Sequence, residues 1–319
     1  MASVSVRWIE GGTARAGGAE LLTPDRPAES IWWVDITEPD EATMLDVGRH
    51  FDLHPLEIED VLHLQHRPKI DLLPEKIFVS WLTPRCDSGG ACAEPLELDI
   101  IIGRDFLITA HNEHIPALEK LGTDNGEGLS RGPDWAVHRV IDELVDTALP
   151  MVDAIGEQLD DLEDAMVREL DPEQLTKLHH LRRDLIHLHR IVSPERDIVR
   201  ALARERDVVS QDAYRYFLDV GDHLARVEDA IETYRDVASS VMDIYLSVQN
   251  NRMNDIMKQL AVVATIFMPL TLISGIYGMN VIVGMWPPVT KVWSFWAVLI
   301  GMVGIGIGML WYFRRKRWW

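Results

Sequence analysis

The longest apolar stretches of this chain lie near its C-terminus. Residues 260–279 and residues 292–313 contain no charged side chain. A helix needs about 20 consecutive apolar residues to cross a hydrocarbon core about 30 Å thick. Each stretch therefore predicts a membrane-spanning helix, and residues 280–291 predict a short loop between the two.

The basic residues around these spans are distributed unevenly. Arg252 and Lys258 precede the first span and a basic cluster at 314–317 follows the second, whereas the loop holds only Lys291. Cytoplasmic ends of membrane spans carry an excess of Lys and Arg. The pattern predicts a two-helix hairpin in the cell membrane, with both termini in the cytoplasm and the loop outside.

Upstream of the spans the pattern changes once. Over residues 1–132, short β-rich runs alternate with helical patterns and Gly or Pro breaks, which predicts a cytoplasmic α/β domain with a mixed sheet. Over residues 133–259 the apolar positions recur every three or four residues, which predicts a stalk of long helices. The predicted strands are residues 4–9, 31–35, 77–82, 96–102 and 106–110. The fold class expected from the whole pattern is an α+β membrane protein that ends in a transmembrane hairpin at 260–319.

The last helical run begins near Gln211 and meets no convincing breaker before Pro269. If it continues to Tyr277, it forms a single helix about 100 Å long, at 1.5 Å per residue. Such a helix predicts a direct mechanical link between the cytoplasmic part and the first span.

Composition narrows the classes of partner. The chain has 31 basic and 51 acidic residues, a net charge of -20. This balance argues against a nucleic acid as the partner, because nucleic-acid binding needs a basic face. An acidic surface suits a protein that binds cations, and it also keeps a large assembly soluble. We find no P-loop, HExxH, nucleophile elbow or dinucleotide fingerprint, so we do not expect the protein to be an enzyme.

The two cysteines, Cys86 and Cys92, match neither a CxxC redox motif nor a zinc-binding motif, and we expect both to be reduced thiols.

Two clusters of potential ligands lie in the predicted stalk. Residues 157–164 are dense in carboxylates, which is typical of a solvated helix face but would also suit divalent cations. The next predicted helix carries four histidines, His179, His180, His187 and His189. No two of them have the four-residue spacing that is typical of zinc ligands on a helix.

The first span carries a line of small or adaptable residues. Counting back from Gly278, two residues before Asn280, in steps of three or four gives Gly275, Thr271, Met268, Ala264, Leu260, Met257 and Asn254. Small residues line close helix contacts, and they also suit a path for ions. Since one helix cannot enclose a water-filled path, a pore lined by this helix requires a homo-oligomer.

Three motifs resemble one family. The sequences HPLEIEDVL at 54–62, QHRPKI at 65–70 and YGMN at 277–280 resemble those of the CorA magnesium transporters, and the resemblance extends along nearly the whole chain. It implies a homopentameric channel for Mg²⁺ influx down the electrochemical gradient. It also implies these roles: a selectivity filter at Gly278, Met279 and Asn280, an apolar constriction at Met257, Leu260 and Met268, and polar rings at Thr271 and Asn254.

The resemblance also implies a regulatory Mg²⁺ site between subunits, held by Asp60, with help from Glu59, and by Asp219. One departure concerns the external loop, where the family carries a glutamate but residues 281–291 include no acid and one base. We therefore expect weaker ion capture at this mouth. The zinc-transporting ZntB branch shares the architecture, so transport of Zn²⁺, Co²⁺ or Ni²⁺ is an alternative. A membrane-tethered sensor or scaffold is a third.

Overall fold

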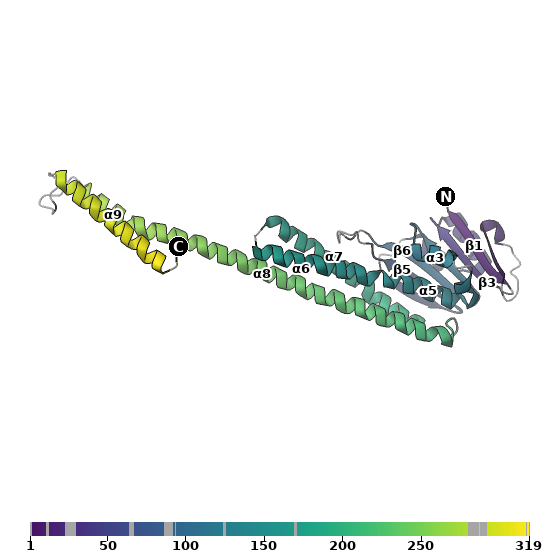
Figure 1. The fold of residues 1–319 in the computed structure, drawn as a ribbon. Coiled ribbons are helices and arrows are strands. Elements are labelled where there is room, and N and C mark those ends of the chain that lie inside the picture. Colours follow the sequence, from purple (N-terminus) through teal and green to yellow (C-terminus); the bar gives the residue numbers. More distant parts are fainter. Residues whose placement is uncertain are drawn as a thin grey trace. The chain divides into compact units, whose positions relative to one another are not determined.

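The computed structural model describes residues 2–10, 13–22, 30–63, 67–85, 92, 94–123, 126–168, 171–279, 287, 292–316 and 318. The chain divides into an N-terminal unit, Met1–Met242, and a C-terminal unit, Asp243–Trp319. Figure 1 shows the elements that make up each unit.

A seven-stranded mixed sheet forms the first part of the N-terminal unit, in the order β2-β1-β3-β7-β6-β5-β4. Only β3 and β7 pair in parallel; the other neighbours are antiparallel. The mixed sheet confirms the expected fold class. The strands are β1 (Ser3–Glu10), β2 (Thr13–Gly17), β3 (Ile31–Thr37), β4 (Lys69–Leu73), β5 (Lys76–Thr83), β6 (Leu96–Gly103) and β7 (Phe106–His111).

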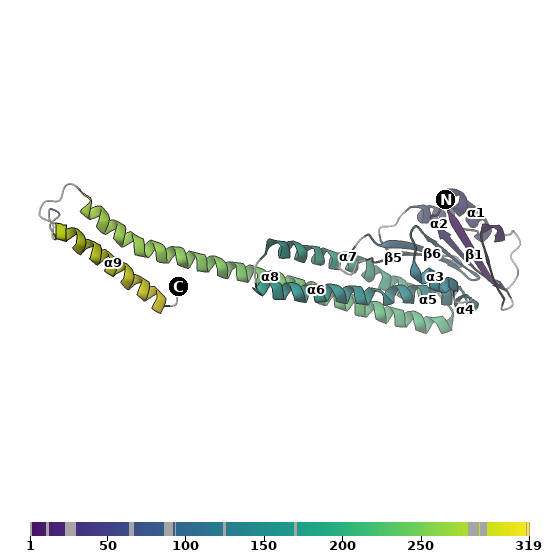
Figure 2. The same cartoon turned by 45° about the horizontal axis from the view of Figure 1, so that its top comes forward.

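Helices cover both faces of this sheet (Figure 2). On one face, α1 (Glu41–Phe51) and α2 (Pro55–Leu62) enclose a core that includes Trp32, Phe51 and Ile101. Leu98, Ile100 and Ile102 of β6 are also buried and point to the opposite face, since side chains alternate along a strand. There α5 (Pro133–Asp146) packs against β6 and β7. The short helices α3 (Pro116–Thr123) and α4 (Glu127–Ser130) precede α5, and η1 (Ala19–Leu21) is a 3-10 turn.

The start of α2 is fixed by a capping box. The backbone N–H of His54 donates to Glu57 Oε2 at 2.6 Å, and the backbone N–H of Leu56 donates to His54 Nδ1 at 3.2 Å. Pro55 occupies the first helical position, where its missing N–H costs no helical hydrogen bond. These contacts fix the orientation of α2 and therefore the placement of Glu59 and Asp60 in its last turn.

Long helices follow: α6 (Ala148–Arg168), α7 (Pro172–Leu202), α8 (Gln211–Tyr277) and α9 (Val292–Arg315). The α8 helix contains 67 residues, with Pro269 inside it, so the long helix expected from residue 211 is confirmed. Two contacts fix its start: Asp134 Oδ2 accepts from the backbone N–H of Ser210 at 2.9 Å, and Ser210 Oγ accepts from that of Ala213 at 3.2 Å. Both α8 and α9 contain a stretch long and apolar enough to cross a membrane.

The turn between β6 and β7 gives a stability prediction. A Cβ on Gly103 would lie 2.2 Å from Cε1 of Phe106, whose ring is buried in the core. Overpacking of a core typically costs about 1–3 kcal/mol. Gly103→Ala should therefore lower the free energy of unfolding of the N-terminal unit, as measured by chemical denaturation of the detergent-solubilised protein.

Gly221 of α8 is the matched control for Gly103. A Cβ there would be 3.9 Å from Val199 Cγ1, an ordinary contact, and alanine in a helix interior is favoured over glycine by about 1 kcal/mol. Gly221→Ala should leave stability unchanged or raise it. Equal effects of the two substitutions would contradict the steric argument.

Candidate functional site

The line of residues predicted to face a pore is exposed along α8 of the single chain. Met257, Leu260, Met268 and Met279 are 56, 69, 73 and 58% exposed. The smaller members of the line are also exposed: Asn254, Ala264, Thr271, Gly275 and Gly278. Asn280 lies outside the described residues, as does most of the predicted external loop. The described part of the line is thus available to neighbouring copies or lipid.

Two hollows follow this line within the C-terminal unit. One, of about 560 Å³, is lined by Ala264, Met268, Thr271, Gly275 and Met279 together with apolar neighbours. The other, of about 660 Å³, includes Asn254 and Met257. Both hollows are shallow and open, and large exposed Met side chains line them as well as small residues.

Backbone hydrogen bonds close the end of α8 next to the predicted filter. The N–H of Gly278 donates to the Ser274 carbonyl at 2.9 Å, and the N–H of Met279 donates to that of Ile276 at 3.3 Å. The Thr271 hydroxyl donates to the Phe267 carbonyl at 2.8 Å, so its oxygen offers lone pairs to a cation or to water. A Cβ on Gly275 would meet no atom within 4 Å.

In α9, the glycine that adjoins α8 is not one of the pair whose spacing suggests a helix contact. A GxxxG spacing such as that of Gly304 and Gly308 is typical of a helix-packing face. A Cβ on either residue would meet no atom within 4 Å, whereas one on Gly306 would lie 4.0 Å from Leu270 of α8. Gly306 therefore marks the side of α9 that adjoins α8 in the same chain.

Asp60 of the predicted regulatory site already has a cationic partner. Its Oδ2 is 2.8 Å from Lys69 Nζ, which also lies 3.0 Å from Asp71 Oδ2. Burial would lower the pKa of Lys69, but hydrogen bonds and charge from Asp60 and Asp71 raise it overall. Glu59 is exposed, and its backbone carbonyl accepts from the ring of His63 at 2.8 Å. The ammonium group of Lys69 therefore occupies the carboxylate of Asp60 that a cation would bind.

Asp219 lies at the edge of a second cluster of ligands, between α5 and α8. His223 Nε2 is 3.6 Å from Asp219 Oδ2, and His223 Nδ1 is 3.4 Å from Asp146 Oδ1. Ligand atoms of Asp142, Asp146 and His223 all lie within 4.8 Å of one another. Burial raises the pKa of Asp142, although the charge of a protonated His138 opposes this. The carboxylate oxygens suit Mg²⁺, and the imidazole adds a donor that suits Zn²⁺, Co²⁺ or Ni²⁺.

The sequence contained a signal for this cluster that we did not use. Asp142 and Asp146 are one helical turn apart on α5, and Asp219 and His223 are one turn apart on α8, so each pair shares a face. Among the described residues, neither the acidic stretch 157–164 nor the histidines of α7 bring three ligand atoms as close together.

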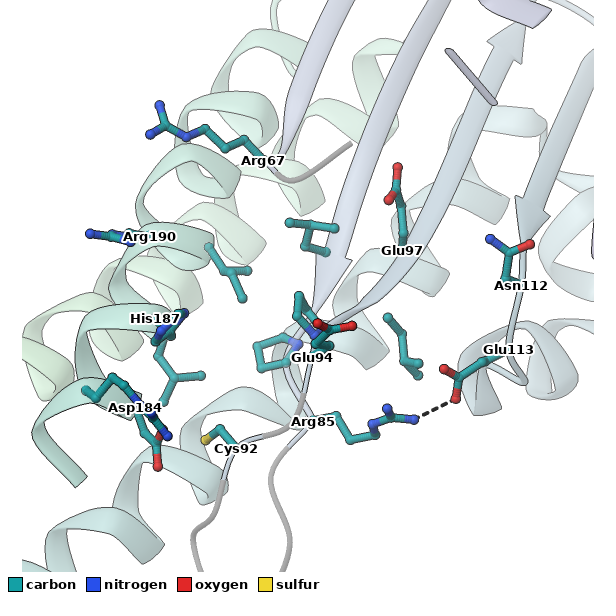
Figure 3. A pocket seen from close by; sticks show the side chains of 17 residues that line it. Arg67, Arg85, Cys92, Glu94, Glu97, Asn112, Glu113, Asp184, His187 and Arg190 are labelled. Carbon is teal, nitrogen blue, oxygen red and sulfur yellow. Dashed lines mark hydrogen bonds and ion pairs between the residues drawn. The ribbon is translucent and has the colours of Figure 1, made fainter. Parts of the chain in front are cut away.

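A cavity of about 690 Å³ lies between α7 and the adjoining ends of β5 and β6 (Figure 3). Its lining carries both signs of charge, and Arg85 pairs with Glu113 at 2.6 Å. Cys92 lines this cavity and is disulfide-bonded, and no described cysteine is free. The expectation of reduced thiols is therefore wrong for Cys92. The described lining includes none of the predicted site residues.

Asp99 of β6 is a buried acid close to Asp60 and Lys69. It is 5% exposed. Burial, reinforced by the charge of Glu97, raises its pKa to about 8. Since an unfolded aspartate has a pKa near 3.9, the folded state favours the protonated form. Asp99 therefore makes its full contribution to the free energy of unfolding below about pH 4, and this contribution is lost as the pH rises through about 8.

Substitution of Asp99 tests this assignment. Asp99→Asn stays neutral at every pH, so its free energy of unfolding should fall less between pH 5 and pH 9 than that of the wild type, by a few kcal/mol at about 1.4 kcal/mol per pKa unit. Parallel denaturation series over this range measure the difference. A difference that does not change with pH would show that Asp99 does not titrate there.

Comparison with known proteins gives concordant matches. The family described as "CorA-like Mg2+ transporter protein" matches residues 28–315. The cobalt/magnesium transport protein CorA of Thermotoga maritima is 30% identical over 305 residues, which cover 94% of this chain and 86% of the relative. The zinc transport protein ZntB of Yersinia enterocolitica is 23% identical, with 95% and 93% covered. The complete structure of the CorA magnesium transporter from Methanocaldococcus jannaschii matches with a TM-score of 0.84 at 24% identity, and covers 99% and 98% of the two chains.

Proposed function

Because this chain belongs to the family of CorA-like Mg²⁺ transporter proteins, we propose that it is a channel for Mg²⁺ influx down the electrochemical gradient. A divalent ion that moves inward gains about 4.6 kcal/mol per 100 mV of inside-negative potential, so transport needs no ATP. The chain spans the cell membrane twice, through the end of α8 and through α9, with both termini in the cytoplasm and lipid around the outer helix.

The observation that carries this proposal is the exposed line from Asn254 to Met279 on α8, along which two shallow hollows lie. Five copies around an axis would turn this line into the wall of a path. Mg²⁺ gives up its first-shell water reluctantly, so the filter at Gly278, Met279 and Asn280 contacts the hydrated ion through neutral oxygens. Met257, Leu260 and Met268 form the apolar constriction, which closes by dewetting.

Regulation is assigned to the cytoplasmic carboxylates. In the proposal, cytosolic Mg²⁺ bound between subunits by Asp60, with help from Glu59, and by Asp219 holds the closed state. Its loss lets the subunits separate and opens the path. The additional oxygens of Asp142 and Asp146 near Asp219 support a cation-binding role for this region.

The alternative cargo is Zn²⁺, Co²⁺ or Ni²⁺. In the cytoplasmic cluster, His223 lies beside three carboxylates, and this set of ligands favours a transition metal as the regulatory ion. The external loop lacks the acid that the family carries at this position, so the ion that enters is less strongly tied to Mg²⁺. Relatives named for cobalt/magnesium transport and for zinc transport are similar to this chain.

Ion uptake into proteoliposomes tests the proposal. The purified chain is reconstituted, and uptake of Mg²⁺, Zn²⁺, Co²⁺ and Ni²⁺ is measured with an inside-negative potential and with none. We expect Mg²⁺ uptake that increases with the potential and is lost in Asn280→Ala. Uptake of Zn²⁺ alone would establish the alternative, and no uptake of any of the four ions would favour the tethered sensor.

A further inference from the structure

Lys69 of β4 connects carboxylates on one face of the sheet. Besides its ion pairs with Asp60 and Asp71, its Nζ lies 5.1 Å from the ring centroid of Phe78. Its side chain is 30% exposed, and that of Asp60 is 27% exposed. The ammonium is thus held against Asp60 in a partly desolvated setting, where charge interactions are stronger than in water.

Further acceptors lie on the same face as Lys69. Lys69 pairs with Ser80 of β5, and Ser80 with Asp99 of β6, so the three side chains form a row across three strands. The Ser80 hydroxyl donates to Glu97 Oε1 at 3.2 Å. Asp99 Oδ1 is buried and makes no hydrogen bond in the part of the chain that the structure describes.

This group of residues contains four carboxyl groups, those of Asp60, Asp71, Glu97 and Asp99, and one ammonium. The charges of Asp60 and Lys69 both act on Asp99, with opposite signs. A lysine is a compact charge on a flexible stem, so Lys69 can change partners within the row without movement of the backbone.

Within the proposed regulation by cytosolic Mg²⁺, on which this inference rests, we infer that Lys69 competes with the divalent cation for Asp60. In the cation-free subunit the ammonium occupies the carboxylate. A cation that binds Asp60 displaces the ammonium toward Asp71, whose carboxylate takes up its charge. Closure therefore requires a higher cation concentration than Asp60 and Asp219 would require without Lys69.

Two substitutions should shift the cation response in opposite directions. Lys69→Met keeps most of the apolar stem but removes the competitor, so half-maximal closure should occur at about tenfold lower Mg²⁺, since a like charge is lost beside the site. Asp71→Asn removes an acceptor for the displaced ammonium, so closure should require more Mg²⁺. General destabilisation would not produce opposite shifts.

The measurement combines two readouts on the full-length protein. Inhibition of uptake by internal Mg²⁺ is titrated in proteoliposomes, and the thermal unfolding midpoint is titrated with Mg²⁺ in detergent, because a ligand that binds the folded state raises the midpoint. Arg49→Met is the control: it removes one positive charge from an ion pair whose side chains are 77 and 75% exposed, and it should match the wild type.

Asp219→Ala separates this inference from the proposed function. If Asp219→Ala loses the Mg²⁺ response while Lys69→Met matches the wild type or needs more Mg²⁺, the competition is refuted and the sensor stands. If Asp219→Ala responds like the wild type, both are refuted. Should Lys69→Met fail to fold, Asp71→Asn decides alone: a shift to higher Mg²⁺ supports the competition, and no shift or a shift to lower Mg²⁺ overturns it.

Discussion

Replacement of Gly275 by leucine is expected to reduce Mg²⁺ uptake to the level of empty liposomes. Gly275 lies in one of the shallow hollows along the line on α8, and a Cβ there would meet no atom of its own chain within 4 Å. The substitution should therefore leave the fold of the single chain intact. In a ring of subunits it would place one leucine from each copy into the path, where apolar side chains favour dewetting and closure.

Gly301→Leu is the matched control for this experiment. Gly301 lies on α9, and a Cβ there also meets no atom within 4 Å. The added volume and apolar character are the same, but in the proposed arrangement α9 forms the outer ring and faces lipid. Uptake by Gly301→Leu should resemble that of the wild type. Undiminished uptake in Gly275→Leu, with oligomers of wild-type size by gel filtration, would remove this face of α8 from the path.

The sequence pattern predicted those strands of the sheet that carry buried apolar residues and missed the exposed ones. The runs at β1, β3, β5, β6 and β7 were predicted because these strands carry buried apolar residues. By contrast, β2 lies at the sheet edge and is almost entirely exposed, so it carries no apolar pattern. The other edge strand, β4, has no fully buried residue and was not among the predicted strands.

The helices were predicted for a related reason. The absence of a breaker between Gln211 and Pro269 indicated the length of α8, and the period of a helix placed its small residues on one line. No pattern along the chain, however, indicates that α5 and α8 lie side by side, so the cluster of Asp142, Asp146 and His223 was missed.

The partners of the predicted site residues were also beyond sequence reasoning. Asp60 and Lys69 are 9 residues apart, and no pattern along the chain indicates that the end of α2 and the start of β4 bring their charges together. The disulfide at Cys92 was wrongly excluded, because the spacing of two loop cysteines decides neither pairing nor redox state.

The second large effect concerns gating. If the proposed sensor is right, Asp219→Ala should raise the internal Mg²⁺ concentration that half-inhibits uptake by at least about tenfold, since loss of even an outer-shell partner typically costs 10–100-fold in metal affinity. Asp60→Ala should do likewise. Asp222→Ala is the matched control, because Asp222 is an exposed carboxylate of α8 close to Asp219 in the sequence, and it should retain wild-type inhibition.

The double mutant distinguishes a shared site from separate ones. If one Mg²⁺ bridges Asp60 and Asp219 of neighbouring subunits, removal of either ligand already destroys the site, so Asp60→Ala with Asp219→Ala should shift inhibition little further than either alone. Additive shifts would indicate two independent cations. Proteolysis in detergent provides a second readout, because Mg²⁺ should protect the wild type but neither single mutant. Wild-type inhibition in the double mutant would move the sensor to Asp142, Asp146 and His223, whose ligand atoms could hold a cation within one subunit.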